Sequence, residues 1–223
     1  MDIKIHTTRE IQQRIPRLKF GLVKGQQTTV QKECVEFDGY FADLEHYLKT
    51  TFANAPLSSH PVIGHVRRMY RKIGWEPTRY RPSSEALARR ILQGKGLYRI
   101  YNLVDLGNMV SARFHLPMGL YDADKIQGEI WFDVGREGES YQGISRQEIH
   151  AQGKLILRDR IGIFGNPTAD SKRTSLSEQT KNMLVIFFTP PEIDLSYLNQ
   201  TLDLLINYFS PYAKHLEKEV ITF

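Results

Sequence analysis

Asp105 and Asn108 are the first candidates for chemistry in this sequence, because they stand three residues apart and share one face of a helix. Asp105 lies between Val104 and Leu106, which predicts a partly buried carboxylate held by backbone amides or by an arginine. For Asp105 we favour this structural role. Asn108 is equally suited to a structural role and to ligand contact.

A second polar cluster lies in a long loop and at the start of the apolar segment after it. Short hydroxyl and carboxamide side chains at the entrance of a strand can orient water or a substrate, but they also form ordinary turns. We favour turns on this pattern alone. The members are Asp170, Ser171, Arg173, Thr174, Thr180, Lys181 and Asn182.

Several classes of site are not expected. The seven histidines are scattered and none forms an HExxH pair, and Cys34 is the only cysteine, so we expect no metal site and no intramolecular disulfide. The segment around Lys95 reads GKGLYR and matches neither a phosphate-binding loop nor a dinucleotide fingerprint. Ser145 lacks the second glycine of a nucleophile elbow. The sequence therefore predicts no cofactor.

Positive charge is concentrated in one segment. Residues 67–99 hold ten Lys or Arg against two Glu, a local net charge of +8, whereas the remaining chain carries −3 within an overall +5. A basic patch on a slightly acidic body predicts a polyanionic partner, with a solvated helix face as the alternative. The residues that we expect to contact phosphates are Arg67, Arg68, Arg71, Arg89, Arg90 and Lys95.

Apolar periodicity predicts the helices that position these groups. Apolar residues recur at helical spacing in each predicted helix, and Gly74, Pro77 and Gly94 end two of them. The third helix is expected to have Asn102 as its N-cap. The predicted helices cover residues 39–52, 62–73, 83–93 and 102–114, with an amphipathic helix after Asp194.

Short apolar runs predict strands at residues 18–23, 126–134, 155–158, 161–164 and 183–188. This order favours one α+β domain with a β-sheet or sandwich core flanked by helices. We expect residues 1–60 to form a lead-in strand and helix, 61–190 the core, and 191–223 a C-terminal amphipathic helix. No run of about 18 apolar residues is present, so we expect no membrane association and a cytoplasmic location.

The segment YRIYNLVDLGNMVSARFHLPMGLYDADK, residues 98–125, resembles a motif of the tRNA-binding and editing domain in the β subunit of bacterial phenylalanyl-tRNA synthetase. The later SEQTKNMLV is similar to a strand of the same domain. Freestanding versions of this domain share RPSSEAL, the two arginines before a GKG hinge, and the loop from Asp170 to Thr174. The resemblance covers roughly residues 69–188.

This resemblance implies the domain's α+β fold and either hydrolysis of mischarged aminoacyl-tRNA or tRNA binding without catalysis. An aminoacyl ester is already activated, so such a site mainly positions water and stabilises the oxyanion. Asn108 matches the family's pocket asparagine, and Asp170 or Ser171 its acidic specificity loop, which makes these three the catalytic candidates. Gly107 and Gly119 stand where the family has threonine and histidine. The expected pocket residues are Gly107, Gly119, Thr174 and Thr180.

Two further functions remain open from the sequence. One is a non-catalytic RNA-binding module that keeps the basic helices. The other is a small-molecule binder that senses a free amino acid. The expected partner is tRNA or aminoacyl-tRNA in the first case and an amino acid in the second.

Overall fold

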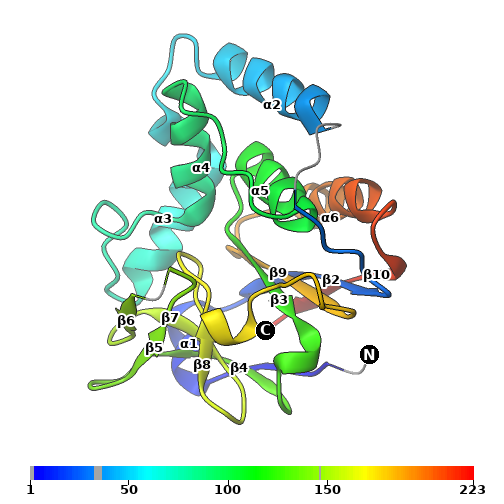
Figure 1. The fold of residues 1–223 in the computed structure, drawn as a ribbon. Helices are drawn as coiled ribbons and strands as arrows, with labels where there is room; N and C mark the ends of the chain where they lie inside the picture. The colour runs from blue at the N-terminus through cyan, green and yellow to red at the C-terminus, as the bar shows by residue number, and fades with distance from the viewer. Residues whose placement is uncertain (1–2, 33–36, 146) are drawn as a thin grey trace.

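A computed structural model describes residues 3–32, 37–145 and 147–223, and Cys34 lies outside these ranges. Two four-stranded sheets and a two-stranded hairpin are flanked by helices, which confirms the predicted α+β class (Figure 1). Among the described residues, no helix is both long and apolar enough to cross a membrane.

The first sheet is antiparallel, in the order β10-β2-β9-β3. Its strands are β2 (Lys19–Gln26), β3 (Met118–Asp122), β9 (Met183–Thr189) and β10 (Lys214–Thr222). Every residue of β9 is buried, as expected for the run MLVIFFT with apolar residues on both faces. β9 is therefore the centre of the core.

The second sheet has the order β1-β4-β7-β8, and only β1 and β4 pair in parallel. Its strands are β1 (Ile5–Thr7), β4 (Ile130–Val134), β7 (Leu155–Arg158) and β8 (Ile163–Gly165), with the hairpin β5 (Ser140–Gln142) and β6 (Glu148–His150) beside it. Phe20 of β2 meets Phe132 of β4 edge-on at 4.9 Å between ring centroids. The two sheets thus share one aromatic core, as a sandwich does.

Helices cover the outer face of the first sheet and extend beyond it (Figure 1). Gly21 of β2 permits close approach of α6, because a Cβ there would lie 2.7 Å from Leu198. The helices are α1 (Arg9–Arg14), α2 (Asp38–Thr51), α3 (Pro61–Lys72), α4 (Ser83–Leu92), α5 (Asn102–Phe114) and α6 (Leu195–Phe209), with short 3-10 turns η2 (Leu57–Ser59), η3 (Ala123–Lys125) and η4 (Lys172–Thr174).

Three details differ from the sequence prediction. The C-terminal segment is helical only in α6, and β10 then pairs with β2 because its backbone completes the sheet edge. The segment expected as a lead-in contributes β1 and β2, which belong to the two sheets. Asn102 is the first residue of α5, and its amide side chain bonds the Thr29 carbonyl and the Gln31 amide instead of capping the helix.

Candidate functional site

Three adjoining hollows meet at Asn108 of α5. We call them the apolar pocket, about 360 Å³, the basic pocket, about 420 Å³, and the connecting pocket, about 320 Å³. Asn108 lines all three, and Ser83 and Thr168 line both the basic and the connecting pocket. These hollows therefore form one continuous groove between α4, α5 and the loops after β5 and β8.

The apolar pocket has the size and lining of a small-ligand site. Asn108 and Asp170 face it from different elements, α5 and the loop after β8, and Lys172 and Ser175 add further polar groups. Its remaining walls are Ile100, Tyr101, Val104, Met118, Leu120, Ile144 and Leu176. Two of the sequence-predicted catalytic candidates are thus brought to one pocket.

Buried contacts hold α5 in place beneath this pocket. Asp105 is 3% exposed, and its carboxylate accepts the Ile100 amide at 2.9 Å, which ties the helix to the pocket rim. Burial raises the pKa of Asp105. Gly107 lies behind the pocket rather than in its lining, and a Cβ there would lie 2.7 Å from the terminal methyl of Met118. The structural role favoured for Asp105 agrees with these contacts.

A buried phenol lies behind the polar end of the apolar pocket, in contact with Asp170. The Tyr121 hydroxyl donates to Asp170 Oδ1 at 2.7 Å. A Cβ at Gly119 would lie 1.9 Å from this hydroxyl, and one at Gly165 2.6 Å from it. Burial raises the pKa of Asp170 to about 7, and burial followed by the Asp170 charge raises the pKa of Tyr121. The space above Gly119 is therefore filled by Tyr121.

The basic pocket carries guanidinium groups with unused donors. Arg90 lies 3.9 Å from the ring centroid of Tyr98, which is 58% exposed. The Nε atoms of Arg89 and Arg90 and the Ser83 hydroxyl are buried and form no hydrogen bond with any described residue. Lys95 also lines this pocket. Unused donors beside exposed cations are suited to an anionic ligand.

The arginines of α3 are engaged elsewhere. Arg67 forms a two-pronged pair with Glu85 at 2.9 and 2.6 Å, and the Glu85 side chain is 1% exposed. Arg68 contacts His65, and Arg71 is exposed. None of these three arginines belongs to the described lining of the groove. Their role in tRNA binding stays a prediction.

Ser171, Thr174 and Thr180 are buried outside the lining of the groove. The Ser171 hydroxyl accepts the Arg173 amide at 3.1 Å, and the Thr180 hydroxyl donates to Asp122 at 2.8 Å. Thr174 donates weakly to the Phe164 carbonyl at 3.4 Å. These contacts are typical of turns, and a catalytic or pocket role for the three residues remains untested.

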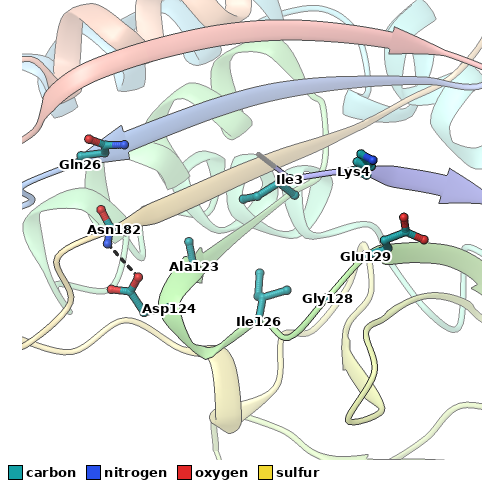
Figure 2. A pocket seen from close by; sticks show the side chains of 9 residues that line it. All are labelled: Ile3, Lys4, Gln26, Ala123, Asp124, Ile126, Gly128, Glu129 and Asn182. Atoms are coloured by element: carbon teal, nitrogen blue, oxygen red, sulfur yellow. Dashed lines mark hydrogen bonds between the residues drawn. The ribbon is translucent and has the colours of Figure 1, made fainter. Parts of the chain in front are cut away.

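A separate hollow of about 540 Å³ lies near the start of the chain and η3 (Figure 2). Asn182 donates to Asp124 at 2.7 Å within it, and Lys4 and Glu129 lie at its other side. It shares no described lining residue with the groove. In the part of the chain that the structure describes, no group of three or more metal-binding side chains occurs.

Sequence reasoning missed Met118, Ile144 and Tyr98 as groove residues, and it missed Tyr121 as the partner of Asp170. A usable signal existed for Tyr121, since it stands two residues after Gly119 and alternate strand residues share a face. No comparable signal marked Ile144, which reaches the groove from the loop after β5.

Comparison with known proteins identifies the family of this chain. The family model described as the B3/4 domain matches residues 65–213, more than half of the chain. The chain belongs to the B3/4 domain family. The matched B3/4 region runs from α3 to the end of α6 and includes Asn108, Asp170 and the basic pocket.

Relatives of this B3/4 chain include the phenylalanine–tRNA ligase beta subunit of Fusobacterium nucleatum, 30% identical over 110 residues that cover 46% of this chain and 13% of the relative. Uncharacterized protein YhzB of Bacillus subtilis is 28% identical over 105 residues, 47% of this chain and 44% of that protein. A solved N-terminal fragment of the phenylalanyl-tRNA synthetase β-subunit from Pyrococcus horikoshii has a TM-score of 0.47 at 12% identity, covering 99% of this chain and 50% of that one. The chain thus spans well under two thirds of these relatives.

Proposed function

We propose that the chain binds the acceptor end of a tRNA and hydrolyses a mischarged aminoacyl ester in the apolar pocket. The observation that carries this proposal is the shared residue Asn108, which lines both the basic pocket and the apolar pocket. A nucleotide phosphate bound in the basic pocket would place the attached aminoacyl group in the apolar pocket. The proposal includes a cytoplasmic location, where tRNA is available.

The basic pocket supports the RNA part of the proposal. Arg89, Arg90 and Lys95 supply positive charge, and phosphate contacts provide affinity without requiring sequence recognition. Tyr98 presents an exposed ring at the rim, and bases of single-stranded RNA stack on such rings. An unpaired acceptor end offers both phosphates and unstacked bases.

Hydrolysis of an aminoacyl ester requires few protein groups, because the ester is already activated. Water attacks the ester carbonyl carbon, the bond to the ribose oxygen breaks, and the proton from water passes to that oxygen. The Asn108 amide can donate to the carbonyl oxygen as negative charge develops there. Asp170 orients the aminoacyl group from the opposite side, and proximity supplies much of the rate.

A panel of mischarged tRNAs with the purified protein tests this function. We expect turnover of at least one of them, and Asn108→Ala should lower its kcat by about 100-fold or more while leaving the Kd for tRNA nearly unchanged. Asn207→Ala, an exposed asparagine on α6, is the matched control and should retain activity.

Two outcomes would replace the proposal. Tight tRNA binding without turnover on any member of the panel would favour the non-catalytic RNA-binding module. Binding of a free amino acid by a protein with no affinity for tRNA would favour the amino-acid sensor.

A further inference from the structure

Behind the polar end of the apolar pocket, a phenol that belongs to the protein already bonds the pocket carboxylate Asp170. Tyr121 is fully buried, its hydroxyl bonds Asp170 at 2.7 Å, and its ring meets Phe164 edge-on at 4.9 Å between centroids. Gly119 and Gly165 leave the room that this ring needs, since a Cβ at either position would clash with the hydroxyl. Tyr121 is thus held in the wall behind Asp170, outside the described lining of the pocket.

This arrangement disfavours a substrate hydroxyl at the same place. A ligand phenol that donates to Asp170 Oδ1 would have to displace a buried hydroxyl with the same chemistry, and the displaced hydroxyl would lose its partner. Leaving a buried donor unpaired is costly. Oδ1 is therefore not free for a hydroxyl on the ligand side chain, and the other walls of the pocket are mostly apolar. The remaining acceptor positions of Asp170 are available to a stronger donor, a ligand cation.

Asp170 still has acceptor capacity. A carboxylate offers about four acceptor positions, and Tyr121 uses one of them. The residue is only partly buried and lines both the apolar and the connecting pocket. No described side chain forms an ion pair with it. A partly buried carboxylate without a cationic partner is a binding group for a ligand cation.

We propose that Asp170 binds the α-ammonium of the aminoacyl group while the Tyr121 hydroxyl occupies Asp170 Oδ1 and so disfavours a bond from a side-chain hydroxyl. The site then accepts aminoacyl groups with a free α-amine and an apolar side chain, and rejects N-acylated or para-hydroxylated ones. The inference rests on the proposed function, and it names the substrate class of the same site. Asn108, across the pocket on α5, is left to bind the carbonyl oxygen.

Direct binding tests this without any turnover. The probes are non-hydrolysable adenosine analogues with a 3′-amide-linked leucyl, methionyl, phenylalanyl or tyrosyl group, each also in N-acetylated form, titrated by calorimetry. We expect the best apolar probe to lose at least about tenfold in affinity on N-acetylation, as loss of a charged hydrogen bond requires. The tyrosyl probe should bind at least about tenfold more weakly than the phenylalanyl probe.

Two conservative variants assign these effects to their residues. Asp170→Asn keeps the shape and an acceptor for Tyr121, and should abolish most of the difference between free and N-acetylated probes. Tyr121→Phe keeps the buried ring and should narrow the gap between tyrosyl and phenylalanyl probes without changing the effect of N-acetylation. If a variant does not fold, the titrations of the wild-type protein with the free, N-acetylated and tyrosyl probes still test the proposal.

Equal affinity for free and N-acetylated probes, or a tyrosyl probe as tight as the phenylalanyl one, would overturn the inference. Absence of binding by every probe at millimolar concentration would also overturn it. Failure of this substrate inference can be distinguished from failure of the proposed hydrolysis. Turnover of mischarged tRNA together with equal probe affinities removes only the inference, whereas discriminating probe binding without any turnover removes only the hydrolysis.

Discussion

At the scale of single residues, Gly119 and Tyr121 form one unit. A side chain at position 119 and the Tyr121 ring compete for the same space, because a Cβ at Gly119 would lie 1.9 Å from the hydroxyl and 2.3 Å from the ring carbon that bears it. The glycine is therefore required by its neighbour, and not by a special backbone conformation.

Gly119→Ala should destabilise the protein by about 1–3 kcal/mol, the usual cost of overpacking. Tyr121→Phe should relieve only part of this cost, since ring carbons also lie too close. In a double-mutant cycle, Gly119→Ala combined with Tyr121→Ala should be more stable than the sum of the single effects. Urea denaturation measures the stability of each of these variants, and strict additivity would contradict the competition for space.

His115 and the partly buried Asp170 make opposite contributions to the pH dependence of stability. Burial, with His60 as a smaller cause, lowers the pKa of His115 to about 3, so His115 stabilises the fold above about pH 6.5 and loses this contribution as pH falls below it. Burial raises the pKa of Asp170 to about 7, so its ionisation costs stability as pH rises from about 4 to 7. Tyr121, Tyr141 and Lys172 are the other titratable groups near Asp170.

Between pH 5 and 6.5 these contributions oppose each other in the wild-type protein. His115→Asn, which suits the positive φ of 56° at this position, should make stability fall more steeply with rising pH than in the wild type. Asp170→Asn should make it rise more steeply. Each difference is at most about 1.4 kcal/mol per pH unit, measurable by urea denaturation at several pH values. Parallel curves for wild type and variants would contradict these pKa shifts.

At the scale of elements, α3 and α4 are joined by a charge cluster around Glu85. Arg67 pairs with it in a two-pronged geometry, while Arg81 and Arg89 lie at 3.4 and 3.8 Å. One carboxylate among three guanidiniums leaves a net positive charge at the basic pocket. Glu85 thus holds two helices together and also positions Arg89 beside Asn108.

Arg67→Ala should lower the free energy of unfolding by about 3–5 kcal/mol, because it removes the strongest partner of the buried Glu85 carboxylate. Arg71→Ala, on the exposed side of the same helix, should change stability by less than about 0.5 kcal/mol. Thermal and urea denaturation of both variants test this contrast. Equal, small effects would mean that Arg81 and Arg89 replace Arg67 fully.

The sequence predicted those elements whose formation depends on local pattern, and missed those that depend on distant pairing. The all-apolar run of β9 and the periodic helices α3 to α6 were predicted because local pattern determines them. The three-residue strand β1 was not, since it exists only by pairing with β4 more than 120 residues away. The edge strand β10 was not predicted either, because its alternating Lys and Glu residues do not form an apolar run. Asn108 and Asp170 were predicted individually. The Tyr121–Asp170 bond depends on tertiary contact, and the sequence indicated only that Tyr121 shares a strand face with Gly119.

At the scale of the whole molecule, the excess positive charge of residues 67–99 is divided between two surfaces. Arg89, Arg90 and Lys95 line the groove, whereas Arg68 and Arg71 lie on α3 outside its described lining. A phosphate contact contributes to the salt dependence of binding only where the RNA lies. The salt dependence therefore reports which of the two surfaces the tRNA covers.

The slope of log Kd against log salt concentration should decrease in magnitude by about 0.7 for each lost contact to a single-stranded phosphate. We expect Arg89→Ala and Arg90→Ala each to show this decrease in tRNA binding. Arg71→Ala should leave the slope unchanged if the RNA lies in the groove alone, and should decrease it if the contact predicted for Arg71 also forms. Arg71 is a suitable control because it is an exposed arginine of the same basic segment. Filter binding at four salt concentrations is sufficient. A decrease for Arg71→Ala equal to that for Arg89→Ala would extend the RNA interface over α3, and a decrease for Arg71→Ala alone would move the RNA away from the groove and separate it from Asn108.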